Sequence, residues 1–502
     1  MLKRLVFAVV ICLFVIAIIS GCRGDNAGTT SVPQTFIPEE WVGKKIGVII
    51  GTIHDQVIAE YIPGSVPAYF SDSQSIVLAL RNGQIDGMLS DREEFEKVHS
   101  PHYPDLRLLE PEFDPSEAGM LVSKEKPELL QKINEFLAEI KADGTFDEMY
   151  DRWLGGDEIM PDIPQGTGEV LKFGTSGISD GFSYFKDGEI VGFDIEFAKR
   201  FAEWADMILE TTVMDFSGLI PALQSGKIDF AASCFAITEE RKKSADFTDP
   251  YLSAARALIV HDPAAAVSEE SGGLISWLKT GFDRNLLQEN RWKMIVDGLL
   301  VSIRITILAF TLATLLGFGV CGLRMSKKPA LNAFGSIYVT VLRGTPIVVL
   351  LMIAFYVIFA KSNISGTTVA IIAFGANGAA FIGEIVRSAI LTVDKGQIEA
   401  ARSMGFSKAS AFFTVTFPQA VRVAFPVYMS ELISLFKTTS VVGYVAVMDL
   451  TRAGDIIRSR TYDAFFPLLF VALVYLASAS LMIWLLGWIN RKTNKRLRRG
   501  NA

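Results

Sequence analysis

Two patterns of hydrophobic and polar residues follow one another along the chain of 502 residues. Between about residues 41 and 262, short β-rich runs such as KKIGVII at 44–50 alternate with amphipathic runs such as VGFDIEFAKRFAEWA at 191–205. This alternation is typical of α/β domains. From Gly298 onward, apolar stretches approach the length of about 20 residues that a membrane-spanning helix needs. The pattern therefore predicts a multidomain protein in which an α/β part precedes five transmembrane helices. The apolar stretches cover about 298–323, 346–360, 367–390, 424–447 and 465–488.

The overall composition is an average over these two parts. Hydrophobic residues make up 50% of the chain and charged residues 21%, and the mean hydropathy is +0.34. That balance is too apolar for an ordinary soluble enzyme. The net charge of −7 argues against binding to nucleic acid. Four cysteines and four histidines are too few for a disulfide scaffold or a histidine-rich metal site, so we expect no metal and no cofactor.

The N-terminus has the pattern of a targeting segment. Lys3 and Arg4 precede an apolar run at 5–19, and small residues follow it, which predicts a secretory signal peptide over 1–21. The sequence ISGC at 19–22 resembles a bacterial lipobox, which implies that Cys22 carries a lipid and begins the mature chain. An uncleaved signal anchor is the alternative. Residues 22–40 are rich in small and polar residues and are interpreted as a flexible tether.

Positive charges predict how the spans are oriented, because lysine and arginine concentrate in cytoplasmic loops. The loop after the first span carries Arg324, Lys327 and Lys328, and residues 491–502 form a basic tail. This predicts a multi-pass protein of the bacterial cytoplasmic membrane, with the α/β part outside and the C-terminus inside. Residues 274–296 mix aromatic and basic residues, which predicts a helix at the membrane surface, with a plain linker helix as the alternative.

The predicted cytoplasmic loop contains EAARSMGFSKASAFFTVTFPQA at 399–420, whose spacing resembles the EAA loop of ABC-importer permeases. Alanines open a helix face to close packing, and a glycine can turn the chain out of a short helix. The resemblance implies that the loop docks on a separate dimer of ABC ATPase subunits. An ordinary amphipathic loop helix is the alternative. The matching residues are Glu399, Ala400, Ala401, Gly405 and Pro418, with Val415 and Phe417 where Ile and Leu are usual.

Two further motifs are similar to the histidine/glutamine-type permeases for polar amino acids, over about 290–490. They are RGTP at 343–346 and GEIVR at 383–387. The resemblance implies that the permease part forms a dimer, for which a homodimer is expected and a heterodimer is the alternative. Glu384 and Arg387 are separated by three residues and are expected to pair on one helix face, with contact to substrate as the alternative.

Other classes of protein were weighed against an importer. VVGYV at 441–445 is similar to a potassium-channel filter but lacks its first Thr and last Gly, so Gly443 is interpreted as a packing position. The sequence contains no G-x-x-x-x-G-K-[ST] phosphate loop. We therefore expect that the chain is not an enzyme and that a partner hydrolyses ATP. A ligand-gated channel and a transmembrane amino-acid sensor remain the alternatives.

Two segments before the spans resemble parts of a periplasmic amino-acid-binding protein of family 3. Residues 171–262 resemble its first lobe, through LKFGTSG, DFSGLIPALQSGKIDF and AITEERKKSADFTDPY. Residues 41–155 resemble its second lobe and closing helices, through WVGKKIGVIIGT and ALRNGQIDGMLSDRE. The family has the opposite order, so the domain is predicted to be circularly permuted. A truncated tandem of domains and a half-domain that pairs with another chain are the alternatives.

The same resemblance implies an amino-acid site. Arg241 matches the arginine that holds the α-carboxylate, which a guanidinium can bind with two hydrogen bonds. Asp91 matches the acid that receives the α-ammonium, and Phe216 matches a pocket wall. Gly51 and Thr52 end a strand where a helix begins, so they are expected to assist the carboxylate.

Three positions depart from the family pattern and leave the ligand's side chain open. Ser179 stands where many members have an aromatic residue, Ala236 where Ser or Thr is common, and Ile53 where Thr or Gly is frequent. Ser233 completes the predicted site. The loss of the hydroxyl at Ala236 removes one donor to the carboxylate.

The sequence thus predicts a two-lobed α/β binding-protein fold followed by an all-α permease of five helices. The function implied is that of the binding and permease subunit of an amino-acid ABC importer, with an amino acid, an ATPase dimer, a second copy and membrane lipid as partners. The expected segments are the signal peptide 1–21, the lipid-anchor tether 22–40, the second lobe with closing helices 41–168, the first lobe 169–262, the linker and interfacial helix 263–296, the permease 297–490 and the tail 491–502.

Overall fold

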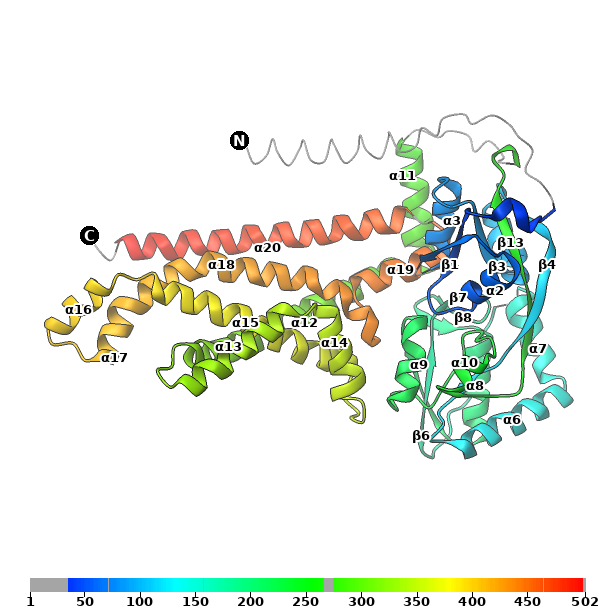
Figure 1. The fold of residues 1–502 in the computed structure, drawn as a ribbon, viewed down its shortest axis with the longest axis horizontal. Coiled ribbons are helices and arrows are strands. Elements are labelled where there is room, and N and C mark those ends of the chain that lie inside the picture. The colour runs from blue at the N-terminus through cyan, green and yellow to red at the C-terminus, as the bar shows by residue number, and fades with distance from the viewer. Residues whose placement is uncertain (1–34, 71, 157, 266–273, 464, 500–502) are drawn as a thin grey trace. The chain divides into compact units, whose positions relative to one another are not determined.

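The computed structural model describes residues 35–70, 72–156, 158–265, 274–463 and 465–499 (Figure 1). The predicted signal peptide and Cys22 lie outside these residues. The chain divides into two compact units. Unit 1 comprises Met1–Ser116 and Ser253–Ser271, and unit 2 comprises Glu117–Leu252 and Gly272–Ala502.

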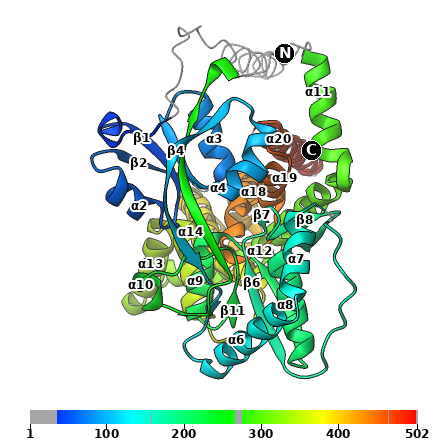
Figure 2. The ribbon, with the colours of Figure 1, turned by 90° about the vertical axis from the view of Figure 1, so that its right-hand side faces the viewer.

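Unit 1 is built on a five-stranded sheet in the order β2-β1-β3-β13-β4 (Figure 2). The strands β2, β1 and β3 are parallel, and β13 runs antiparallel to β3. Ile46 and Val48 of β1 are fully buried, as the apolar run at 44–50 predicts for a central strand. The elements are β1 Lys45–Ile49, α2 His54–Tyr61, β2 Val66–Phe70, α3 Ser73–Arg81, β3 Gly87–Asp91, β4 Leu106–Ala118 and β13 Leu252–His261.

The α/β part of unit 2, residues 117–252, has a second five-stranded sheet in the order β10-β6-β11-β5-β12. It repeats the pattern of unit 1, because three parallel strands are followed by a strand that runs antiparallel to the third. The chain passes from unit 1 to unit 2 within β4 and returns at the start of β13. The strands are β5 Leu121–Val122, β6 Val170–Thr175, β7 Ile178–Ser179, β8 Ser183–Lys186, β9 Glu189–Val191, β10 Ile208–Val213, β11 Phe230–Ala231 and β12 Asp246–Phe247, and the helices are α6 Pro127–Ala142, α7 Thr145–Leu154, α8 Phe193–Trp204, α9 Phe216–Gln224 and α10 Glu239–Lys242.

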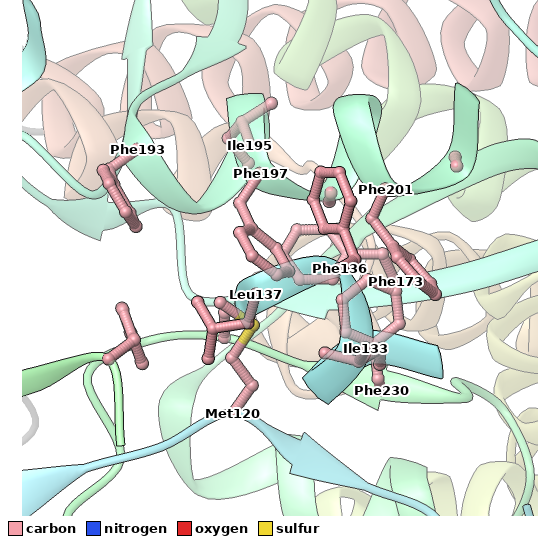
Figure 3. Close-up of a cluster of buried hydrophobic side chains, with 14 of the residues drawn as sticks. Met120, Ile133, Phe136, Leu137, Phe173, Phe193, Ile195, Phe197, Phe201 and Phe230 are labelled. Carbon is pink, nitrogen blue, oxygen red and sulfur yellow. The ribbon is translucent and has the colours of Figure 1, made fainter. Parts of the chain in front are cut away.

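An aromatic core joins α6 to the sheet of this α/β part (Figure 3). Phe193, Phe197 and Phe201 of α8 recur every four residues and therefore share one helix face. The ring of Phe136 on α6 lies 5.4 Å from that of Phe197 and 5.7 Å from that of Phe201. The helix α6 comes from the segment before residue 156 and α8 from the segment after residue 170, so the two segments share one hydrophobic core.

A buried carboxylate on α8 fixes the position of α7. Glu196 of α8 is fully buried, and its oxygens accept hydrogen bonds from Arg152 at 2.6 Å and from the indole nitrogen of Trp153 at 2.6 Å. Arg200, one turn later, donates to Glu196 at 2.8 Å. Because a buried charge is costly unless it is paired, these contacts define how α7 packs on α8.

The carboxyl group of Asp194 in this core gives a testable pH dependence. It is fully buried and accepts a hydrogen bond from Tyr251 at 3.2 Å, and burial raises the pKa of Asp194 from 3.8 to about 8. The native state keeps this proton at pH values where the unfolded chain has lost it, so rising pH between these values lowers stability by up to about 1.4 kcal/mol per unit. We expect Asp194→Asn to be more stable than wild type, with an advantage that grows from about pH 5 to about pH 8.

Denaturant unfolding of the detergent-solubilised chain, followed by tryptophan fluorescence at several pH values, measures this effect. Asp151→Asn is the matched control, because it removes an exposed carboxylate of α7. An Asp194→Asn advantage that is the same at every pH would show that Asp194 is ionised in the native protein.

The helical part of unit 2 is residues 274–499. It contains three single helices long and apolar enough to cross a membrane, and up to five spans if two bent helix pairs each count as one. The three long helices overlap the first, third and fifth apolar stretches of the sequence. The helices are α11 Leu274–Phe282, α12 Trp292–Arg324, α13 Pro329–Gly344, α14 Ile347–Ile353, α15 Gly366–Leu391, α16 Lys395–Ser403, α17 Lys408–Ala411, α18 Phe417–Thr438, α19 Leu450–Thr461 and α20 Phe466–Arg499.

The second and fourth apolar stretches are not single straight helices. The helix α13 ends at Gly344, and the chain resumes as a helix at Ile347 after a bend of 106°. Pro346 lies at the break, where its missing N–H and its effect on the preceding residue disfavour a continuous helix. In the fourth stretch, the segment Lys408–Val445 and α19 are bent by 55°.

Glycines allow α12 and α15 to pack closely. A side chain on Gly375 would lie within 2.6 Å of Leu312, and one on Gly383 would lie within 2.8 Å of Val320. Small residues are typical of helix contacts in membranes, where close backbone approach provides the attraction. These contacts make α12 and α15 the central pair of the helical part.

The segment 274–296 differs from the single helix that its sequence predicts. The helix α11 ends at Phe282, and shorter helical turns follow before α12 begins at Trp292. Glu289 and Asn290 adopt positive φ angles of 51°, which interrupts the helix. Residues 292–296 therefore belong to the first long helix.

Candidate functional site

Arg241 is held in a fixed orientation in the α/β part of unit 2. It lies on α10, whose first residues are capped by the Thr238 hydroxyl, which accepts a hydrogen bond from the Arg241 N–H at 3.2 Å. The side chain is buried, and its Nη1 donates to the carbonyl oxygen of Ala236 at 3.0 Å. The sequence ITEER thus places a buried guanidinium on a short capped helix.

Two aromatic rings lie beside this guanidinium. Phe216 and Phe235 are stacked with ring centres 4.7 Å apart, and the Arg241 Cζ lies 5.9 Å from the first and 5.7 Å from the second. Cations are attracted to aromatic faces, most strongly where water is excluded. Phe216, which the sequence predicts as a pocket wall, thus lies beside Arg241 together with Phe235, which the sequence did not single out.

The other predicted residues of this part take different places. Ser233 follows β11, and its hydroxyl donates to that of Ser176 at 2.8 Å. Ala236 is buried and forms a β-bridge with Ala118. Ser179 lies on the separate three-stranded sheet β7-β8-β9, opposite Ser183. The structure therefore brings Phe216, Ala236 and Arg241 together, and it places Ser233 beside the end of β6.

Gly51 and Thr52 lie in unit 1 between β1 and α2. Gly51 has a φ of +84°, which favours glycine, and the Thr52 hydroxyl donates to the carbonyl oxygen of Ile49 at 2.7 Å. The hydroxyl proton of Thr52 is thus directed to the backbone. Its oxygen remains an acceptor, whereas the sequence-based hypothesis gave the hydroxyl the role of a donor to a carboxylate.

Asp91, the last residue of β3, forms an ion pair within unit 1. Its Oδ1 lies 3.2 Å from Nε of Arg256, the residue opposite it on β13. Arg256 is buried and also bonds to the Ser116 hydroxyl of β4. Asp91 is therefore paired with Arg256 at the end of β3.

The EAA-like loop forms a helix–turn–helix in the helical part of unit 2. Glu399 and Ala400 lie on the exposed face of α16, and Ala401 is buried. Gly405 has a φ of +91°, and the N–H of Phe406 donates to the carbonyl oxygen of Ala401 at 3.2 Å, as in a helix ended by a left-handed glycine. Pro418 occupies the first turn of α18, where its missing N–H costs nothing. The turn predicted at Gly405 is confirmed.

Two family models and several relatives match this chain. The model of bacterial extracellular solute-binding proteins, family 3, matches residues 42–156 and 171–374. The model of binding-protein-dependent transport system inner membrane components matches residues 291–495. A putative glutamine transport system permease protein of Rickettsia typhi is 32% identical over 202 residues, which is 39% of this chain and 92% of that protein. The chain belongs to both families.

Other similar proteins match the permease part. The L-cystine transport system permease protein of Bacillus subtilis is 37% identical over 188 residues, covering 37% of this chain and 80% of that protein. The crystal structure of an amino acid ABC transporter with histidines is 31% identical, with a TM-score of 0.39, and covers 44% of this chain and 99% of that one. The chain thus joins the solute-binding and permease parts of a binding-protein-dependent transporter, a membrane-embedded system that works with an ATPase and a substrate.

The permease part contains the ion pair that the sequence predicts. Arg387 Nη2 lies 2.9 Å from Glu384 Oε2, so the pairing within α15 is confirmed. Arg324 at the end of α12 also binds Glu384, with its Nε 2.9 Å from Oε1. The sequence gave no sign of this third member, because Arg324 is 60 residues away in the chain.

Met404 is a residue of the EAA-like loop that the motif does not single out. It precedes Gly405, and its side chain is 77% exposed, although the residue is apolar. Its exposure, rather than the sequence, draws attention to this side chain at the turn of the EAA-like loop.

Proposed function

We propose that the chain is the combined binding and permease subunit of an amino-acid ABC importer. The observation that carries this proposal is the buried Arg241, held against Phe216 and Phe235, in a family 3 domain that is continuous with a permease. A guanidinium fixed in an apolar setting binds a carboxylate with charge-assisted hydrogen bonds. The named relatives support the amino-acid class, since one is a putative glutamine transport system permease and another an L-cystine transport system permease.

In this proposal, Arg241 holds the α-carboxylate and Asp91 holds the α-ammonium. Ser233 and the backbone after Gly51 and Thr52 complete the hydrogen bonds. Phe216 forms an apolar wall of the side-chain pocket. Ser179 and Ala236 give the ligand fewer polar or aromatic contacts than the family pattern, which leaves room for a larger or non-standard side chain.

We also propose that the binding domain is circularly permuted. The shared core of α6 and α8 supports this arrangement, because a truncated tandem would not join its two segments in one core. The two sheets have equivalent strand orders, which also supports the permutation. The strands of each lobe can pair in the same way whichever lobe comes first along the chain. The break would lie at one hinge strand, where β13 ends near residue 262.

The membrane arrangement follows from the same proposal. The permease part crosses the cytoplasmic membrane five times, with its binding domain outside and its C-terminus inside. Two copies form a homodimer, and their loops at Glu399–Gly405 engage an ATPase dimer that hydrolyses the ATP. A signal peptide would direct export of the N-terminus. The lipidated Cys22 would then attach it to the outer face of the cytoplasmic membrane, in contact with lipid.

A ligand screen tests the proposed substrate class. Thermal melting of the full chain in detergent, with each standard amino acid and L-cystine in turn, is expected to show a marked stabilisation by one or a few of them, as linkage requires. Matched carboxylic acids without an amino group serve as controls and are expected to give smaller shifts. A chain stabilised equally by the amino-free acids, or by none of the ligands, would contradict an amino-acid site.

A further inference from the structure

The helix α19 connects the two functional parts within unit 2. It follows α18 and precedes α20 in the permease part (Figure 1). Asp449 caps its N-terminus, with Oδ1 accepting from the N–H of Arg452 at 3.0 Å. The helix contacts α12 and α20 of the permease part and the strands β7 and β8 of the α/β part. It therefore touches both parts of the same unit.

Arg452, in the first turn of α19, reaches into the α/β part. Its Nη1 lies 2.6 Å from Oδ1 of Asp215. Its Nη2 donates to the carbonyl oxygen of Ser176 at 2.8 Å and to that of Met214 at 3.3 Å. Only 8% of the Arg452 side chain is exposed. The guanidinium thus binds one carboxylate and two backbone carbonyl oxygens. In the described part of the chain, no other cation binds these three acceptors.

These three acceptors adjoin the proposed ligand-binding residues. Ser176 directly follows β6, and its hydroxyl is bonded to that of Ser233. Asp215 is the N-cap residue of α9, and the next residue is Phe216, whose ring lies beside Arg241. Any shift of Ser233 or Phe216 that accompanies ligand binding therefore changes the geometry of the acceptors of Arg452.

The C-terminal end of α19 contacts the same α/β part. Arg460 Nη1 lies 2.8 Å from Oδ1 of Asp180, and the Tyr462 hydroxyl, just after the helix, donates to Oδ2 of Asp180 at 2.6 Å. Asp180 follows Ser179 of β7. The helix is thus attached at both ends to the strand ends of the α/β part, while its own body packs on α12 and α20.

We propose that Arg452 reports the occupancy of the ligand site to the permease through α19. The inference rests on the proposed function and adds the residue that carries the signal. A ligand that rearranges Ser233 and Phe216 alters the free energy of the Arg452 contacts, and that coupling works in both directions. The Arg452 side chain is 8% exposed and that of Asp215 is 32% exposed, so removal of Asp215 leaves a largely buried cation with one acceptor fewer. The pair can therefore distinguish two states of the domain.

The test uses the full chain with its ATPase partner in nanodiscs. ATP hydrolysis is measured with and without each standard amino acid and L-cystine in turn, and the affinity for each is measured on the same samples. We expect Arg452→Lys, which cannot bridge three acceptors in the same geometry, and Asp215→Asn to lower the ligand-stimulated rate at least about tenfold. Affinity is expected to change in the same variants by a smaller factor, because the coupling is reciprocal for binding free energies but does not fix the size of a change in rate.

Lys172→Ala is the matched control. Lys172 lies within β6 and contacts the permease part through Asn363, with its Nζ 2.8 Å from the side-chain oxygen. This variant is expected to keep the ligand stimulation of wild type. Melting curves of all three variants verify that they fold.

Equal loss of stimulation in the Lys172 and Arg452 variants would overturn the inference, because Arg452 would then only help to hold the parts together. Loss of ligand affinity in Arg452→Lys as large as the loss of stimulation would also overturn it, since Arg452 would then belong to the binding site itself. A wild-type complex that binds none of the standard amino acids and no L-cystine, and is stimulated by none of them, would overturn the proposed function together with the inference.

Discussion

Replacement of Arg241 by alanine is expected to weaken amino-acid binding at least about 100-fold, which corresponds to roughly 3 kcal/mol. The guanidinium is buried beside Phe216 and Phe235, so a ligand carboxylate loses both its charge partner and its hydrogen-bond donors when the side chain is removed. Titration calorimetry on the detergent-purified full chain measures the affinity for the amino acid that the ligand screen selects.

Two further variants separate loss of the site from loss of the fold. Lys242→Ala removes the charge of the next residue of α10, which forms an ion pair with Glu239. This variant is expected to leave affinity unchanged. Arg241→Lys keeps the charge but not the two-pronged geometry, and is expected to bind with intermediate affinity. Wild-type affinity in Arg241→Ala, with a normal melting curve, would remove Arg241 from the site.

Replacement of Gly405 by aspartate is expected to abolish transport and to reduce the amount of co-purified ATPase at least about tenfold. The residue has a φ of +91°, where a side chain costs about 1 kcal/mol or more, and the turn positions both Ala401 and the exposed Met404. A carboxylate at the turn also adds a charge to a surface that we propose is buried against the ATPase. Affinity purification of the tagged chain from cells with the ATPase measures the effect.

Gly188→Asp is the matched control for backbone strain. Gly188 lies in the β8–β9 hairpin of the α/β part and has a φ of +87°, close to that of Gly405. It is expected to leave the amount of bound ATPase unchanged. If both variants lose the ATPase equally, the effect comes from general destabilisation, and the docking role of the loop is wrong.

Local features of the fold could be predicted from the sequence. The apolar run at 44–50 forms β1, and the amphipathic run at 191–205 contains α8. The turn at Gly405 and the Glu384–Arg387 pair were also predicted, because a left-handed glycine and a pair three residues apart depend on only a few neighbouring residues.

Contacts between distant residues could not be predicted in this way. Arg256 pairs with Asp91 through neighbouring antiparallel strands, and Arg452 pairs with Asp215 although 237 residues separate them. Neither arginine belongs to a motif, so only the tertiary fold identifies the partners. The break at Glu289 and Asn290 was also missed, since glutamate gives no signal of a positive φ and a single asparagine, although enriched there, gives only a weak one.

ATP-dependent uptake into proteoliposomes tests the central claim most directly. The chain is reconstituted with its ATPase, and a radiolabelled amino acid chosen by the ligand screen is supplied on the side of the binding domain. The account predicts saturable uptake that requires ATP and the ATPase and is lost in Arg241→Ala. Uptake or ion current that persists without the ATPase and depends on the amino acid would contradict an importer and indicate a ligand-gated channel.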